Sequence, residues 1–196
     1  MKNSLAKLSR SRYRPGLTDL VWVAFMLFGL AMGLLGLPKS AFYGLAFGVG
    51  IFGLRAAGLN RSLTLWFTAM SLLQLTAETA GWYGIPNFDK LIHALFPVIG
   101  SLAVYALLVR YGLAPRPSKT HDRHPRFTLA LLVFLLAVAE GALWEIIEFT
   151  SDTVHLFPGL LQHGNIDTMT DIVATFVGAF LAGWVAVRIW YKNKES

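Results

Sequence analysis

The side chains with the most chemical potential in this sequence are acidic, and they occur where acidic groups are costly. Eight of the eleven carboxylates lie within or at the ends of strongly apolar segments: Glu78, Asp89, Glu140, Glu145, Glu148, Asp152, Asp167 and Asp171. Ionisable groups at membrane depth are rare and mark functional sites by default. We therefore expect these carboxylates to form a polar site.

Helical spacing groups these residues, because side chains three and four positions apart lie on one face of a helix. The groups are Asp89 with His93, Asp167 with Asp171, Gln74 with Glu78, and Glu145 with Glu148 and Asp152. Glu140 shares a face with Glu148 and is expected to form a deeper layer. Each of four segments thus offers a short polar stripe.

The chemistry expected of this group is cation binding. Lys90 is the basic side chain nearby, so the remaining negative charge must be met by bound cations, by protonation or by a cationic substrate. Oxygen ligands with an imidazole suit Mg²⁺, Mn²⁺, Ca²⁺, Zn²⁺ or Fe²⁺, and the spacing does not choose among them. The chain has no cysteine, which excludes thiolate ligation and a cysteine nucleophile.

These residues divide into three expected roles. The expected metal ligands are Asp89, His93, Glu148, Asp167 and Asp171. The expected catalytic residues are Glu145 as general acid or base, with Glu148 and His93. The secondary members are Glu78, Glu140, Asp152 and His163.

Simpler roles are open for several of the same residues. Asp167 precedes Thr168 at the start of an apolar segment and would serve as a helix N-cap. Glu78 would cap a break before Gly81, and Asp152 would be solvated at the end of its segment. His121 and His124 lie in a basic loop and are expected to be solvated.

The composition predicts an all-α, polytopic integral membrane protein with six transmembrane helices in one bundle. The chain is 55% hydrophobic and 14% charged over 196 residues. Six apolar runs, each near the roughly 20 residues that a spanning helix needs, occupy about 17–37, 41–59, 63–81, 88–109, 127–149 and 168–191. Residues 1–16 form a basic leader, 17–191 the transmembrane domain and 192–196 a tail.

The basic residues predict the orientation, since Lys and Arg accumulate on the cytoplasmic side of a membrane. With the N-terminus in the cytoplasm, 15 of the 17 Lys and Arg residues fall on the cytoplasmic side, and only Lys39 and Lys90 fall outside. Both termini are then cytoplasmic, and the expected location is a bacterial cytoplasmic (inner) membrane. The net charge of +6 fits topology and anionic lipid. Nucleic-acid binding is not expected, because the basic loop has no interleaved aromatic residues.

This topology brings the carboxylates to one leaflet. A segment that enters near Phe127 places Glu140 roughly 20 Å and Glu148 roughly 30 Å from the cytoplasmic boundary, at about 1.5 Å per residue. The predicted site is a shallow pocket that opens to the extracytoplasmic side. Gly29 with Gly33, and Gly44 with Gly48, form GxxxG patterns that predict close helix packing.

Three stretches carry a family resemblance: Asp89-Lys-Leu-Ile-His93, Glu145-Ile-Ile-Glu148 and Gln162-His-Gly-Asn-Ile-Asp167-Thr-Met-Thr-Asp171. They resemble the YjdF-type group of small bacterial membrane proteins. The later half, 89–183, is also similar to the VanZ-like family associated with glycopeptide resistance. Thr175 stands where that family has Asn, and Pro97 replaces the aromatic residue that usually follows the histidine. The VanZ-like resemblance implies envelope lipids or their polyprenyl carriers as substrates.

Two classes of function remain open from the sequence. The first is a metal-dependent hydrolase or transferase that acts on a lipid or lipid-linked envelope substrate. The second is a cation- or proton-coupled transporter or channel that uses the same carboxylates. The first class is favoured, because the inner halves of the segments carry few ionisable residues and no inverted repeat is evident. Membrane lipids are the expected partners, and the oligomeric state stays open.

Overall fold

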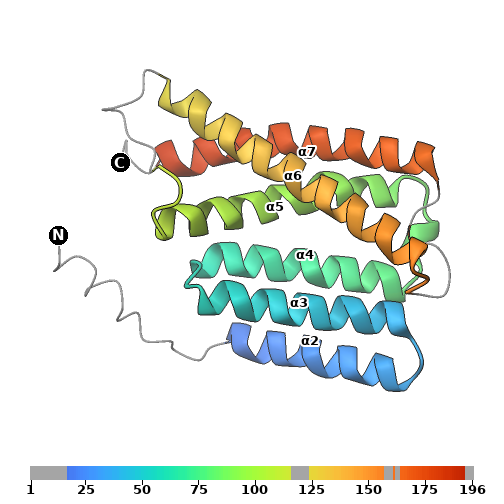
Figure 1. The fold of residues 1–196 in the computed structure, drawn as a ribbon. Coiled ribbons are helices and arrows are strands. Elements are labelled where there is room, and N and C mark those ends of the chain that lie inside the picture. Colours follow the sequence, from blue (N-terminus) through green and yellow to red (C-terminus); the bar gives the residue numbers. More distant parts are fainter. Residues whose placement is uncertain (1–16, 116–123, 157–160, 162–163, 193–196) are drawn as a thin grey trace.

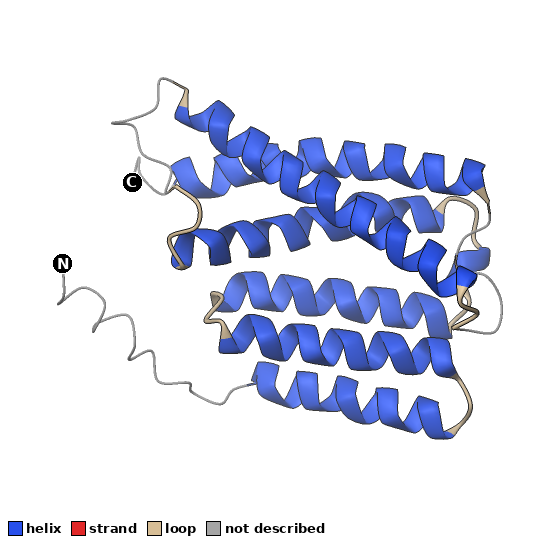
Figure 2. Ribbon diagram, in the orientation of Figure 1, coloured by secondary structure: helices blue, strands red, loops and turns tan. Residues whose placement is uncertain are grey.

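The protein is built from helices alone in the part of the chain that the structure describes. The structure is a computed structural model that describes residues 17–115, 124–156, 161 and 164–192. The elements are α2 (Leu17–Leu34), α3 (Pro38–Ala56), α4 (Arg61–Thr79), the short 3-10 helix η1 (Trp82–Gly84), α5 (Phe88–Arg110), α6 (Pro125–Thr153) and α7 (Asn165–Lys192). Figure 2 shows these helices and the loops that join them. The predicted all-α fold with six long helices is confirmed.

The helices begin and end within four residues of the predicted segments, and local backbone chemistry explains the differences. Gly36 adopts a left-handed backbone with φ of 74°, and Pro38 opens α3, so α2 ends at Leu34. Pro125 likewise opens α6 two residues before the predicted start. Three helices, α5, α6 and α7, are long and apolar enough to cross a membrane. The other three have 18 or 19 residues, roughly 28 Å of helix.

Successive helices are connected at alternate ends of the bundle (Figure 1). One end, here called the basic end, contains the connections at residues 56–61 and 110–125, together with residues 17 and 192. The other, the acidic end, contains the connections at 34–38, 79–88 and 153–165. Arg55, Arg61 and Arg110 lie at the basic end, where Arg55 pairs with Asp19 at 3.4 Å. The charge separation expected from the sequence is therefore present along the bundle.

Two groups of helices make two apolar cores. In the first, α5, α6 and α7 pack around Leu102, Tyr105, Val133 and the small residues of α7. In the second, Phe25 of α2 and Phe47 and Ile51 of α3 pack together near Leu75 of α4. Phe96 of α5 and Trp144 of α6 pack against the second core, so these two aromatic side chains join the two helix groups.

Small residues set the closest helix contacts. A Cβ built on Gly44 of α3 would lie 2.8 Å from the Cα of Gly29 on α2, and one on Gly48 would lie 2.8 Å from the Met26 side chain. The predicted role in packing is confirmed for Gly29 and Gly44, because the two backbones approach too closely there for a side chain, whereas a Cβ on Gly33 would make only an ordinary contact with Ala41 at 3.7 Å.

Candidate functional site

The site lies at the acidic end, where three helices bring together charged residues that are far apart in the sequence. Helix α5 contributes Asp89, Lys90 and His93, α6 contributes Glu145 and Glu148, and α7 contributes Asp167 and Asp171. Because α5 and α7 begin at this end and α6 ends there, their polar stripes meet (Figure 1). The convergence predicted from spacing and topology is therefore seen for these residues.

Lys90 forms ion pairs with three aspartates on the side of the site that faces α7. Its ammonium nitrogen lies 2.5 Å from Asp167 Oδ1, 2.7 Å from Asp171 Oδ1 and 3.3 Å from Asp89 Oδ2. The Asp171 side chain is only 2% exposed, so a buried carboxylate needs such a partner. Helix α7 begins at Asn165, so Asp167 lies inside the first turn and pairs with Lys90, and the expected N-cap role at Thr168 does not fit this start.

His93 lies between the two sets of carboxylates. Its Nε2 atom is 3.6 Å from Asp89 Oδ1 and 4.0 Å from Asp171 Oδ1, and its Nδ1 atom is 3.6 Å from Glu145 Oε1. The side chain is 5% exposed. The imidazole therefore separates the cluster around Lys90 from the two glutamates of α6.

A proline in α5 helps to define the backbone at His93. Pro97 has no N–H, so the His93 carbonyl, four residues earlier, lacks its usual helical donor. The Thr175 hydroxyl of α7 donates to that carbonyl at 3.4 Å. Two glycines permit this approach, since a Cβ on Gly178 would collide with the Ala94 backbone and a Cβ on Gly141 would collide with the Thr175 side chain. The sequence singles out both Pro97 and Thr175, but it did not predict that they act together.

The two glutamates of α6 lie close to His93, and Glu148 is also held from its own helix. Glu145 and Glu148 are buried, and Trp144 Nε1 donates to Glu148 Oε1 at 2.8 Å. One ligand atom each from His93, Glu145 and Glu148 lie within 4.8 Å of one another, and so do those of Asp89, His93 and Asp171. These distances are compatible with a shared cation. The four-residue spacing of Trp144 and Glu148 was the signal for this contact, and the sequence reasoning missed it.

Two cavities open beside His93. The outer pocket, of about 300 Å³, is lined among others by Lys39, Asp89, Lys90, Glu148 and Asp167. The inner cavity, of about 70 Å³, is lined by Phe47, Ile92, Phe96, Pro97, Glu140 and Gly141. Both are also lined by Gln74, Ile92, His93 and Trp144, so these residues form the wall common to the two.

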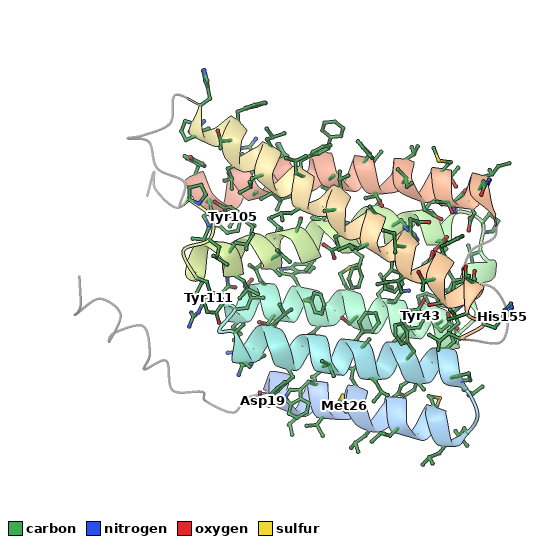
Figure 3. All side chains as sticks on the ribbon, in the orientation of Figure 1. Asp19, Met26, Tyr43, Tyr105, Tyr111 and His155 are labelled. Carbon is green, nitrogen blue, oxygen red and sulfur yellow. The ribbon has the colours of Figure 1, made fainter. Side chains whose placement is uncertain are left out.

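Two tyrosines belong to the outer pocket and were not predicted. Tyr43 of α3 and Tyr83 of η1 line it together with Gln74 of α4. Burial, together with the nearby Tyr43, Asp89 and Glu78, raises the pKa of the Tyr83 phenol, which therefore stays a neutral hydrogen-bonding group. Figure 3 shows Tyr43 toward the acidic end of the bundle, with Tyr105 and Tyr111 toward the basic end.

The secondary residues expected from the sequence occupy separate positions. Glu78 pairs with Lys39 at 3.1 Å, and Asp152 accepts a hydrogen bond from the Leu161 backbone N–H at 2.8 Å. Glu140 lines the inner cavity, as expected for a deeper layer. His163 lies outside the described residues.

Comparison with known proteins places the chain in a membrane protein family. A protein of Thermotoga maritima that carries the name "Uncharacterized protein" is 32% identical over 109 residues, which cover 56% of this chain and 50% of that relative. The match thus spans about half of the relative's length. No solved structure matches the chain. The family model described as "Predicted membrane protein (DUF2238)" matches residues 17–192, from the first described helix to the last, and the chain belongs to this family.

Proposed function

We propose that the protein is a membrane-embedded enzyme that depends on a divalent metal and acts on a lipid or lipid-linked envelope substrate. The observation that carries the proposal is the cluster of His93, Glu145 and Glu148, whose ligand atoms lie within 4.8 Å of one another beside a pocket of about 300 Å³. The mixture of one imidazole and two carboxylates suits a hard or borderline divalent ion.

The proposed ligand set is narrower than the set expected from the sequence. Asp167 and Asp171 face the Lys90 ammonium, which already occupies the space between their carboxylates as an ion-pair partner. Glu145 instead faces His93 Nδ1, so it joins the ligands rather than acting as the acid or base. Glu148 is oriented by Trp144, the kind of surrounding hydrogen bond that tunes a metal ligand.

A divalent ion held there would supply a Lewis acid for a phosphoryl or carbonyl oxygen. The chain's own residues would position the reacting group and move the proton. Asp89 is more exposed than Asp167, with side chains 32% and 21% exposed, and it lines the outer pocket and lies 3.6 Å from His93 Nε2. We assign the proton-transfer role to Asp89, because it is within reach of both the pocket and the imidazole.

The position of the pocket at the end of the bundle supports a substrate with a membrane-embedded part. The pocket is bounded by η1, by residues 85–90 at the start of α5, and by Leu161 and Asp167 before and at the start of α7. It therefore lies at the end of the bundle, which in a membrane would be at the level of the lipid headgroups. In the orientation predicted from Lys and Arg, this is the extracytoplasmic leaflet. A lipid or polyprenyl-linked headgroup reaches such a pocket without leaving the membrane.

Metal binding by matched variants tests the proposal. The purified full-length protein is stripped with chelator, dialysed against Mg²⁺, Mn²⁺, Ca²⁺, Zn²⁺ or Fe²⁺ in turn, and analysed by plasma mass spectrometry. We expect Glu145→Gln and Glu148→Gln to weaken binding at least about tenfold. Glu78→Gln is the control, since this carboxylate pairs with Lys39. A wild-type protein that retains none of the five ions contradicts the proposal.

A cation- or proton-coupled transporter is the second candidate, and one observation favours it. Glu140 lies deeper along α6 than Glu145 and lines a cavity that shares His93 with the outer pocket. A protonatable group further into the membrane is what a translocation path requires. Cation or proton flux in proteoliposomes, lost in Glu140→Gln, supports the transporter. A converted lipid species in extracts, lost in Glu148→Gln, supports the enzyme.

A further inference from the structure

The inner cavity carries features that the proposed metal site does not use. It lies beside His93 and is lined by residues of α3, α4, α5 and α6. Its volume of about 70 Å³ is room for a small group rather than for a whole lipid headgroup. Its wall is mostly aromatic and aliphatic, with polar atoms supplied by Gln74, His93 and Glu140.

Two buried oxygen atoms at this cavity lack a hydrogen-bond donor among the described residues. They are Oε1 of Gln74 and Oε2 of Glu140. The Gln74 residue is 4% exposed, so its side chain has little access to solvent. A buried acceptor without a donor destabilises the folded state, and a charged acceptor does so more strongly. Both atoms therefore call for a ligand that donates hydrogen bonds or carries positive charge.

Gly100 of α5 makes room for the carboxylate. A Cβ built on Gly100 would overlap the Glu140 carboxyl group, so the absent side chain is what lets Glu140 lie against α5. The carboxylate is thus fitted into the junction of α5 and α6 and is not directed to the lipid.

Aromatic rings complete the cavity. Phe47 and Phe96 stack with centroids 5.9 Å apart, and Trp144 stacks on Tyr43 at 6.0 Å. The faces of aromatic rings carry negative charge density and attract ammonium groups, most strongly when the site is desolvated. Phe47, Phe96 and Trp144 all line the cavity beside the carboxylate.

We propose that the inner cavity binds a small organic ammonium group, with Glu140 and the Gln74 carbonyl as its polar partners and Phe47, Phe96 and Trp144 around it. Other ligand classes fit less well. A Ca²⁺ or Mg²⁺ ion needs about six oxygen ligands, more than Glu140 and Gln74 supply. An apolar tail would leave both acceptors unpaired, and an anion would be repelled by Glu140.

The ammonium site uses a different carboxylate from the proposed metal site, while Trp144 contacts both, as a wall of the inner cavity and as the donor to Glu148. If both exist, they also define a substrate class. An ammonium group that enters through the outer pocket passes His93 and Trp144, which line both cavities. The substrate would then be a headgroup with an amine a few atoms from the reacting oxygen.

Radiolabelled methylammonium is the probe for this site. The purified full-length protein is titrated in micelles by scintillation proximity, with chelator present and ionic strength held by sodium chloride. We expect saturable binding by wild type and at least about tenfold weaker binding by Glu140→Gln, because the charged partner is lost. Glu78→Gln removes a carboxylate at the end of α4 that pairs with Lys39, and this variant should bind methylammonium within about twofold of wild type.

Phe96→Leu gives a second test that keeps Glu140 intact. It should weaken methylammonium binding by about threefold or more, because threefold corresponds to the weakest cation–π contacts in proteins. Absence of saturable binding by wild type overturns the proposal, and so does equal weakening by Glu140→Gln and Glu78→Gln. Glu148→Gln should lose the divalent metal and keep methylammonium, so the two sites fail separately.

The same assay distinguishes a free amine from a lipid amine. The protein is placed in nanodiscs of phosphatidylglycerol, with or without phosphatidylethanolamine. If the lipid headgroup is the occupant, phosphatidylethanolamine raises the apparent Kd of methylammonium. If a free amine is the occupant, the two nanodiscs give the same Kd.

Discussion

A single hydrogen bond across two helices shows how closely the site is specified at the level of residues. Pro97 removes the donor that would satisfy the His93 carbonyl, and the buried Thr175 of the neighbouring helix replaces it. The imidazole of His93 and the backbone above it are therefore fixed by residues from both α5 and α7. Loss of the Thr175–His93 hydrogen bond should therefore affect the arrangement of the other side chains in the site.

Thr175→Val should lower the free energy of unfolding by about 1–2 kcal/mol, because it leaves a buried carbonyl without a donor. The measurement is SDS-induced unfolding in mixed micelles followed by circular dichroism. Thr170→Val is a control, since the exposed Thr170 hydroxyl bonds only to carbonyls of its own helix.

The Pro97→Ala background makes this test specific. Alanine at position 97 restores an N–H four residues after His93, so Thr175→Val should then cost less than about 0.5 kcal/mol. If Thr175→Val lowers the free energy of unfolding equally with and without Pro97, the hydrogen bond to the His93 carbonyl does not explain the effect.

At the level of residues, the sequence predicted which helix faces carry the site but not which atoms meet. Spacing of three and four placed Asp89 with His93 and Asp167 with Asp171. Lys90 was recognised as a neighbour, yet its contacts with two aspartates of α7 depend on how the helices cross. Such contacts between helices cannot be obtained from the periodicity of either one.

Helix α4 has a buried polar stripe that the aspartate and glutamate pattern did not reveal. Thr64, Thr68, Ser71 and Gln74 are buried along one face. The Thr68 hydroxyl donates to the Thr64 carbonyl at 2.8 Å, and the Ser71 hydroxyl to Phe67 at 2.9 Å. These hydroxyls are satisfied within their own helix, so they favour close packing over a continuous path to the basic end.

The contact of α2 with α3 makes a prediction at the level of helices. A Cβ at Gly44 would lie 2.8–3.1 Å from backbone atoms of Gly29 and Phe25, so Gly44→Ala should separate the helices and cost about 1–3 kcal/mol. Gly53→Ala, on the same helix with nothing within 4 Å of the new Cβ, should be neutral or stabilising by up to about 1 kcal/mol.

SDS-induced unfolding of both variants measures the difference. A similar stability of Gly44→Ala and wild type would mean that the α2–α3 contact is not needed for the fold. The glycine pattern predicted this contact because a GxxxG motif indicates close helix packing from the sequence of one helix, provided that the partner also has a small residue at the contact.

On the scale of the whole molecule, the two ends of the bundle differ in charge. Glu78, Asp89, Glu145, Glu148 and Asp171 lie at or near the acidic end, while Arg55, Arg61 and Arg110 lie at the basic end. This separation was predictable from the sequence, because successive spans run in opposite directions and the acidic and basic residues lie at opposite ends of them. The depth and shape of the two cavities were not, since they depend on the packing of Phe47, Phe96 and Trp144 between the helix groups.

We predict that the basic end faces the cytoplasm. The native chain has no cysteine, so Ala80→Cys at the acidic end and Leu113→Cys at the basic end each introduce a single thiol. A membrane-impermeant maleimide should label Ala80→Cys in intact cells and Leu113→Cys only after permeabilisation. The opposite labelling pattern would place the acidic end, and the pocket with it, in the cytoplasm.

The position of His93 between two groups of carboxylates has a consequence for communication across the site. A neutral imidazole carries one N–H, so its two nitrogens cannot both donate at the same time. A proton on Nε2, toward Asp89 and Asp171, leaves a lone pair on Nδ1 toward Glu145, and the reverse tautomer turns Nδ1 into a donor. A change in the charges around Lys90 would therefore decide whether His93 Nδ1 offers a lone pair to the cation proposed between His93, Glu145 and Glu148. No helix would have to move for this change.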